Sequence, residues 1–121
     1  MSVNKAIILG NVGNDPEIKI FDNGNKVANF SLATSEKWKN KEGEQQEHTE
    51  LHSVAVFGKL ADIVESYVKK GQQLYIEGKI KTRSWDDSDG NKKYSTEIVL
   101  NGFGDTLQML GKKESINDNP F

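Results

Sequence analysis

The clearest alternation of apolar and polar positions in the chain runs from Leu74 to Leu100. Side chains two positions apart share a face of a β-strand, so the segment 74–85 separates into two faces. One face is largely apolar, and the other carries Tyr75, Glu77, Lys79, Lys81, Arg83 and Trp85. Asp89-Gly90 is a turn dipeptide, after which Lys92-Lys93 begins a return strand. The pattern predicts a long two-stranded hairpin whose basic face ends in a tryptophan.

Four segments upstream of this hairpin also have the pattern of β-strands. They are residues 4–12, 17–21, 26–35 and 49–57. The run Ala6-Ile7-Ile8-Leu9 is apolar on both faces, which is consistent either with burial inside one domain or with a partner subunit against one face. Residues 36–47 are polar and charged, so we expect a long, mobile loop there.

A single helix is predicted over residues 60–70. Its apolar positions recur at helical spacing, and they are Leu60, Ile63, Val64, Tyr67 and Val68. Lys69-Lys70 suits the negative end of the helix dipole, and Gly71 suits a left-handed cap. After the hairpin, residues 106–110 form a last short apolar segment.

The order of these elements predicts the fold class. Apart from the short segment 17–21, the order is three strands, a helix and a hairpin. This is the order of an all-β, five-stranded OB-fold Greek-key barrel, which has one helix between its third and fourth strands. In such a barrel the hairpin at 74–100 joins the fourth and fifth strands. We expect one domain over residues 1–111, followed by a short polar tail over 112–121 that is disordered and ends in Pro-Phe.

Composition narrows the class of protein further. The 121 residues suit one domain, and the absence of cysteine excludes disulfides and thiolate metal sites. No apolar run is long enough for a membrane span, and the N-terminus lacks a signal pattern, so we expect a cytoplasmic protein without a membrane partner. The net charge of −2 argues mildly against nucleic acid. The cations are clustered, however, and a local basic patch can bind phosphate despite a neutral total.

Three aromatic residues beside lysines are candidates for stacking on nucleobases. Trp38, Phe57 and Trp85 lie at a loop start, a strand end and a hairpin flank. Such stacking contributes roughly 1–3 kcal/mol per base and tolerates any sequence. The alternative is that these rings pack in the core. The row Lys79, Lys81 and Arg83 is either an ordinary solvated face or a set of phosphate contacts, and the tryptophan at its end favours the second.

Other candidate chemistry fails on spacing. His48 and His52 flank a strand, where four residues span roughly 13 Å, which is too far for one metal ion. The loop at 87–91 fails as a calcium site, because Trp85 and Thr96 would occupy ligand positions. No nucleophile arrangement or pair of carboxylates in an apolar pocket is evident. We therefore expect no metal, no cofactor and no catalysis.

With these residues in view, the sequence resembles the bacterial-type single-stranded DNA-binding proteins. The matching stretches are NKAIILGNVGNDP (4–16), NGNKVANFSLATS (23–35), ELHSVAVFGKL (50–60), YVKKG (67–71), YIEGKIKTRSW (75–85) and QML (108–110). The resemblance implies a homotetramer of OB folds that wraps single-stranded DNA without sequence preference during replication, recombination and repair. It also implies neither catalysis nor a cofactor.

The same resemblance assigns roles to single residues. The stacking positions of the family match Trp38, Phe57 and Trp85, while a fourth, usually Trp, is Leu51 here, where we expect weaker binding. Lysine stands where relatives often have arginine at Lys19, Lys69 and Lys81. The phosphate contacts implied in total are Lys5, Lys19, Lys59, Lys69, Lys70, Lys79, Lys81 and Arg83. His52 and Tyr75 would lie near subunit contacts.

The end of the sequence suggests a further partner. The family's tail ends in acids followed by Ile-Pro-Phe, and this sequence ends Asp118-Asn119-Pro120-Phe121. By resemblance, Asp118, Pro120 and Phe121 would bind replication and repair proteins. Two other interpretations stay open. One is a small OB-fold replication-restart or assembly factor that touches DNA weakly, and the other is a metal-dependent nuclease acting on single strands.

Overall fold

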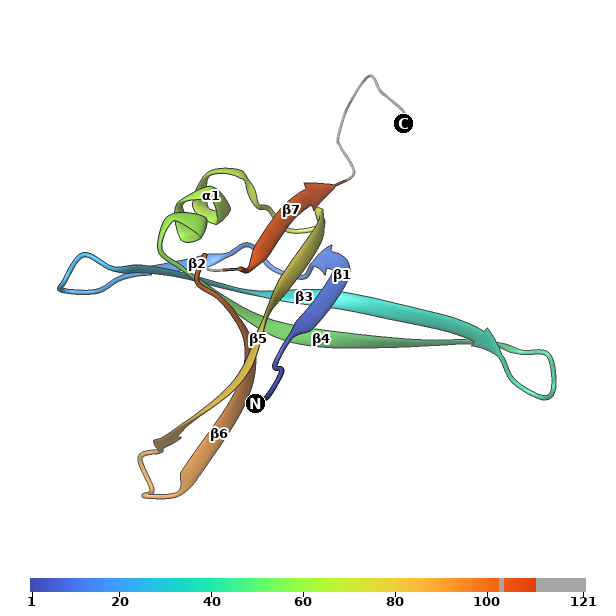
Figure 1. Cartoon of the computed structure of the whole chain (residues 1–121). Helices are drawn as coiled ribbons and strands as arrows, with labels where there is room; N and C mark the ends of the chain where they lie inside the picture. The colour runs from blue at the N-terminus through green and yellow to red at the C-terminus, as the bar shows by residue number, and fades with distance from the viewer. Residues whose placement is uncertain (103, 111–121) are drawn as a thin grey trace.

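The computed structural model describes residues 1–102 and 104–110 and consists mainly of β-strands (Figure 1). In chain order the elements are β1 (Ala6–Val12), β2 (Glu17–Ile20), β3 (Lys26–Lys39), β4 (Gln45–Phe57), α1 (Lys59–Tyr67), β5 (Gln73–Asp86), β6 (Lys92–Leu100) and β7 (Thr106–Leu110). Strands β3 and β4 form one long arm and β5 and β6 form another, and both arms extend away from the rest of the molecule (Figure 1).

Five of the strands form a closed barrel because β1 pairs on both of its edges. It is antiparallel to β3 on one side and to β5 on the other. The path from β3 through β4 and β6 to β5 completes the ring, with a parallel pairing between β4 and β6. Strand β2 adds to β3, and β7 adds to β5. Because α1 lies between the third and fourth barrel strands, the predicted all-β OB fold is confirmed.

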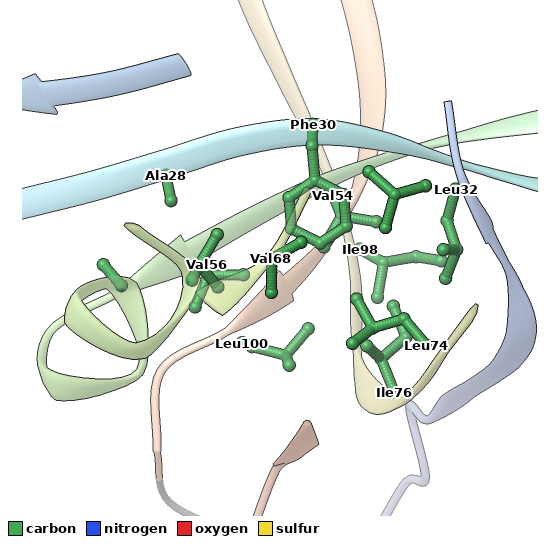
Figure 2. Close-up of a cluster of buried hydrophobic side chains, with 13 residues drawn as sticks. Ala28, Phe30, Leu32, Val54, Val56, Val68, Leu74, Ile76, Ile98 and Leu100 are labelled. Carbon is green, nitrogen blue, oxygen red and sulfur yellow. The ribbon is translucent and has the colours of Figure 1, made fainter. Parts of the chain in front are cut away.

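The barrel is filled by apolar side chains at even-numbered positions of β3, β4, β5 and β6. They include Ala28, Phe30, Leu32, Val54, Val56, Leu74, Ile76, Ile98 and Leu100, which lie together in Figure 2. Val64 and Ala61 of α1 join this cluster, so the helix closes one end of the barrel. The ammonium of Lys26 reinforces that placement, since it lies 2.7 Å from Asp62 Oδ1 and 2.6 Å from Glu65 Oε1 of α1.

Two glycines permit the close approach of strands where the barrel closes. Gly78 lies where β5 changes partner from β1 to β6, and a Cβ there would lie 2.7 Å from the carbonyl oxygen of Val99. Gly10 lies near the point where β1 changes partner from β5 to β3, and a Cβ there would collide with the carbonyl of Ala33. Any side chain at these positions would push the strands apart.

The prediction of a long, mobile loop over residues 36–47 is wrong. Strand β3 continues to Lys39 and β4 begins at Gln45, with unbroken pairing from Val27–Phe57 to Lys39–Gln45. The connection is a tight turn in which the side-chain oxygen of Asn40 accepts the backbone N–H groups of Glu42 and Glu44. The polar composition misled the prediction because this arm extends beyond the core and buries neither face.

The helix is shorter than the pattern predicts, and its end is different. It runs from Lys59 to Tyr67, and Val68 is already extended and buried. Lys69 and Lys70 are therefore outside the last helical turn. Gly71 has the left-handed φ of 90° but closes the turn that follows, rather than the helix. A contact remote in sequence decides this ending, since the carboxylate of Asp15 accepts the N–H of Lys70 at 2.9 Å.

Strand β1 begins at Ala6, two residues later than the pattern predicts. Its outward side chains Ile7 and Leu9 are 57% and 51% exposed, so burial of both faces inside one domain is excluded. The predicted hairpin at 74–100 is confirmed, with β5 and β6 in register from Lys79–Val99 to Asp86–Lys92. In the part of the chain that the structure describes, no helix has the length and apolar character needed to cross a membrane.

Candidate nucleic-acid interface

One continuous outer face runs across five strands of the sheet. Ala55 of β4 pairs with Val99 of β6, which pairs in turn with Lys79 of β5. Paired residues point to the same side of a sheet, and the core-facing positions of these strands are even-numbered. The odd-numbered positions of β2, β3, β4, β5 and β6 therefore form one surface, which we call the outer face. The even-numbered positions form the inner face, which continues along both arms beyond the barrel.

The basic row predicted on β5 lies on this outer face. Lys79, Lys81, Arg83 and Trp85 follow one another at alternate positions, and all four are exposed. The Trp85 side chain is 43% exposed, so the alternative that its ring packs in the core is excluded. The guanidinium of Arg83 lies over this ring, 5.0 Å from its centroid. A row of cations ending in an accessible ring can contact a polyanion and stack on its bases.

Two of these three cations are already paired with carboxylates. The Lys79 ammonium lies 3.7 Å from the nearly buried carboxylate of Asp105, and Arg83 Nε donates to Glu97 Oε2 at 3.2 Å. Lys81 forms no ion pair with any residue that the structure describes. It is therefore the cation of the row whose charge is most available to a phosphate group.

Phe57 and Lys19 lie at the far end of the same outer face. Val27 pairs with both of them, so the three side chains form one row across β2, β3 and β4. The positions of Phe57 and Trp85 can both be read along β6. Phe57 is one position beyond Val56, which pairs with Leu100 of β6, whereas Trp85 pairs with Lys93 of the same strand. The eight residues of chain between these two levels span roughly 26 Å. The outer face is thus a long strip, which suits a linear polymer better than a compact ligand.

Trp38 does not share this strip with Phe57 and Trp85. Trp38 is exposed and pairs with Gln46, so it lies on the inner face of the β3–β4 arm. Lys37 and Lys39, its neighbours in sequence, lie on the outer face instead. Leu51 also lies on the outer face, where it pairs with Ala33 and is 62% exposed. The position that the family resemblance assigns to a fourth stacking ring is therefore open to solvent and occupied by an aliphatic side chain.

The remaining predicted phosphate contacts are spread around the molecule. Lys5 is half-exposed and lies 3.3 Å from Glu77 Oε1. Lys59 is the first residue of α1, and Lys69 lines a shallow pocket between β2 and α1. Lys70 follows in the turn that leads to β5. The structure therefore does not place these four lysines in the basic row of β5, and their contact with phosphate stays a prediction.

The two predicted interface residues lie in different surroundings. His52 is on the inner face at the rim of the barrel, with Nε2 3.0 Å from Thr34 Oγ1. Tyr75 points outward and pairs with Leu9. Its hydroxyl donates to Glu77, and this hydrogen bond, with the ammonium of Lys5, lowers the pKa of the Glu77 carboxyl. The same hydrogen bond raises the pKa of Tyr75.

Several outer-face residues escaped sequence reasoning. The sequence does not assign a face of a strand to Lys37 and Lys39, because the polar composition of residues 36–47 predicts a loop. Glu97 could have been placed by extending the alternation from Leu100 back along the return strand. Among the described residues, no three His, Asp or Glu side chains are grouped so as to hold a metal ion. Asp118, Pro120 and Phe121 lie outside the described residues.

A closed five-stranded barrel with its helix between the third and fourth strands, and with one aromatic and basic face, defines an OB-fold binding domain. The family model described as "Single-strand binding protein family" matches residues 3–110. The chain belongs to this single-strand binding protein family. A solved structure titled "Plasmodium falciparum SSB complex with ssDNA" is similar, with 37% sequence identity and a TM-score of 0.82. The match covers 92% of this chain and 97% of that chain.

Proposed function

We propose that the chain binds single-stranded DNA without sequence preference. The observation that carries this proposal is the exposed row Lys79, Lys81, Arg83 and Trp85 on the outer face. Bases stack on Trp85 and Phe57, phosphates contact the lysines, and none of these groups reads a base edge. Membership of the single-strand binding protein family and the likeness to a complex with single-stranded DNA support the same ligand.

The chemistry of the strip favours a single strand over a duplex. Stacking on an indole or phenyl ring needs the flat face of an unpaired base, which a duplex hides. The net charge of −2 supplies no general attraction to polyanions, so binding depends on the local cations of the outer face. We propose that the protein protects transient single strands during replication, recombination and repair, in the cytoplasm and close to the nucleoid, and that it catalyses no reaction.

We also propose that the working form is a homotetramer. The exposed apolar side chains of Ile7 and Leu9 support this, because Leu9 lies beside Tyr75 on the outward side of the barrel. A second copy would remove this apolar surface from water. Sedimentation equilibrium of the protein and of an Ile7→Lys, Leu9→Lys variant tests the proposal. A monomeric wild type would contradict it.

Recruitment of replication and repair proteins through Asp118, Pro120 and Phe121 is a separate proposal, supported by the resemblance of the last residues to the family's tail. A pulldown with the whole chain and with a variant lacking Phe121 tests it. Recovery of the same partners by both would contradict recruitment through this tip and leave DNA binding untouched.

Tryptophan fluorescence tests the central proposal. The protein is titrated with oligo-dT and with a duplex of the same length, each at two salt concentrations. We expect strong quenching by the single strand alone, with an affinity that falls as salt rises. Equal affinity for both, or quenching by neither, would contradict the proposal and favour an assembly factor that touches DNA weakly. Incubation of labelled oligo-dT with Mg²⁺ tests for nuclease activity, and intact oligonucleotide is expected.

A further inference from the structure

The contact between Arg83 and Trp85 includes a third residue, Glu97. The guanidinium of Arg83 lies over the Trp85 ring, 5.0 Å from the centroid, while its Nε donates to Glu97 Oε2 at 3.2 Å. All three side chains belong to the outer face of the β5–β6 arm. The Arg83 side chain is 62% exposed, whereas that of Glu97 is only 14% exposed. A largely shielded carboxylate therefore fixes an exposed guanidinium from one side.

Glu97 places a carboxylate within the basic row of the outer face. It pairs across the strands with Lys81, yet its carboxylate holds Arg83, one position further along the face. A negative charge in the middle of a basic row repels phosphate. Any favourable contribution of Glu97 to DNA binding therefore comes through the group that it holds rather than through a direct contact.

The guanidinium covers one of the two faces of the Trp85 indole. Arginine stacks well on aromatic rings because its charge is spread over a plane, and it stays charged at any accessible pH. With one face of the ring covered by Arg83, a nucleobase can stack on the other. The ring then lies between a fixed cation and a base, and its orientation is set before the DNA arrives. Pre-organisation of this kind lowers the cost of ordering the side chain on binding.

We propose that Glu97 is a positioning residue, which holds Arg83 against Trp85 and so orients the ring for base stacking. This inference rests on the proposed binding of single-stranded DNA. It gives Arg83 a different role from the phosphate contact implied by the family resemblance, because Arg83 supports the ring. Lysine could not replace it, since an ammonium has no plane to lay over an indole.

The experiment uses Trp38→Phe as the parent, so that Trp85 is the sole tryptophan. Glu97→Gln, Arg83→Lys and the double variant are compared in this parent, by acrylamide quenching of Trp85 without DNA and by affinity for oligo-dT. We expect Glu97→Gln to raise the accessibility of Trp85 and to weaken oligo-dT binding by about 2–5-fold, despite the loss of a negative charge. Arg83→Lys should have the same two effects, and the double variant should be no worse than Arg83→Lys alone.

Glu17→Gln is the matched control, because it also removes a carboxylate from the outer face but lies on β2 beside Asn29. It should leave the accessibility of Trp85 unchanged. The positioning role is wrong if Glu97→Gln binds oligo-dT as tightly as the parent, or more tightly, and leaves Trp85 equally accessible. Glu97 would then only neutralise the positive charge of Arg83. If the Trp38→Phe parent itself does not bind oligo-dT, the proposed function is contradicted instead. Acrylamide quenching of Trp85 without DNA would still test whether Glu97 positions the Trp85 ring.

Discussion

Trp38 and Leu51 lie on opposite faces of the β3–β4 arm. Leu51 pairs with Ala33, five residues before Trp38, so strict alternation puts Trp38 on the other side. The inner-face neighbours of Trp38 are Glu36, Gln46 and His48. Lys37 and Lys39 share the outer face with Leu51 instead. A DNA strand that reaches Trp38 must therefore cross the edge of the arm after it leaves the outer face.

The two tryptophans should accordingly respond to the length of the DNA. An OB fold binds roughly 4–16 nucleotides, so an oligo-dT of about 8 nucleotides can occupy the outer face alone. With this short ligand, Trp85→Ala should weaken binding by roughly 1–3 kcal/mol and Trp38→Ala should change little. With a long oligo-dT, both substitutions should weaken binding. Fluorescence anisotropy of labelled oligonucleotides of increasing length gives the comparison.

The double variant Trp38→Ala, Trp85→Ala measures the combined contribution of the two tryptophans to binding. On long oligo-dT it should lose several kcal/mol, the sum of two stacking contacts of roughly 1–3 kcal/mol each. If the double variant binds long oligo-dT like the wild type, the stacking mechanism is wrong. If Trp38→Ala weakens short and long ligands equally, the separation of the two faces does not govern the path of the DNA.

Leu51→Trp should strengthen binding. The position is exposed on the outer face, so an indole there gains a base-stacking surface without disturbing the core. We expect a gain of roughly 1–3 kcal/mol for oligo-dT and no gain for duplex, measured by titration at fixed salt. Ile20→Trp is a matched control, because Ile20 is also exposed and aliphatic but lies on the inner face beside Lys26. An equal gain from both variants would show that general hydrophobicity, not placement on the outer face, is responsible.

Lys81 should account for one phosphate contact in the salt dependence of binding. It is the cation of the β5 row without an ion pair among the described residues, so its replacement leaves no carboxylate unpaired. Lys81→Ala should reduce the slope of log K against log salt by about 0.7, the value for one phosphate on a single strand. Lys92→Ala is the control, because Lys92 lies on the inner face near Asp86, and it should leave the slope unchanged. Equal slopes for wild type and Lys81→Ala would contradict a phosphate contact by Lys81.

Sequence reasoning succeeded where a strand has one buried face. In the hairpin at 74–100, burial of Leu74 and Ile76 fixes which side faces the core, and alternation then places Lys79 to Trp85 on the other side. The same reasoning failed over residues 36–47, because neither face of that part of the arm is buried and its side chains carry no alternating pattern. The backbone pairing of β3 with β4 and the Asn40 side chain in the turn hold this segment together, and composition does not reveal either.

Long-range contacts account for the other errors. The helix ends at Tyr67 because Val68 is extended and buried and Asp15 binds the backbone of Lys70, across 55 positions of sequence. The face of Trp38 follows only once β3 is known to continue to Lys39. The role of Glu97 likewise depends on the register of β6 against β5, which no local pattern sets.

The Glu77 carboxyl should make the stability of the protein depend on acid pH. Its pKa is lowered from 4.5 by the hydrogen bond from Tyr75 and by Lys5, so its contribution is complete above pH 4.5 and is lost as the pH falls through the lowered value. Glu77→Gln should therefore be less stable than the wild type at neutral pH, with a difference that shrinks below pH 4.5. Urea unfolding at a series of pH values measures this, with Glu17→Gln as the control. A difference that is the same at all pH values would contradict the assignment.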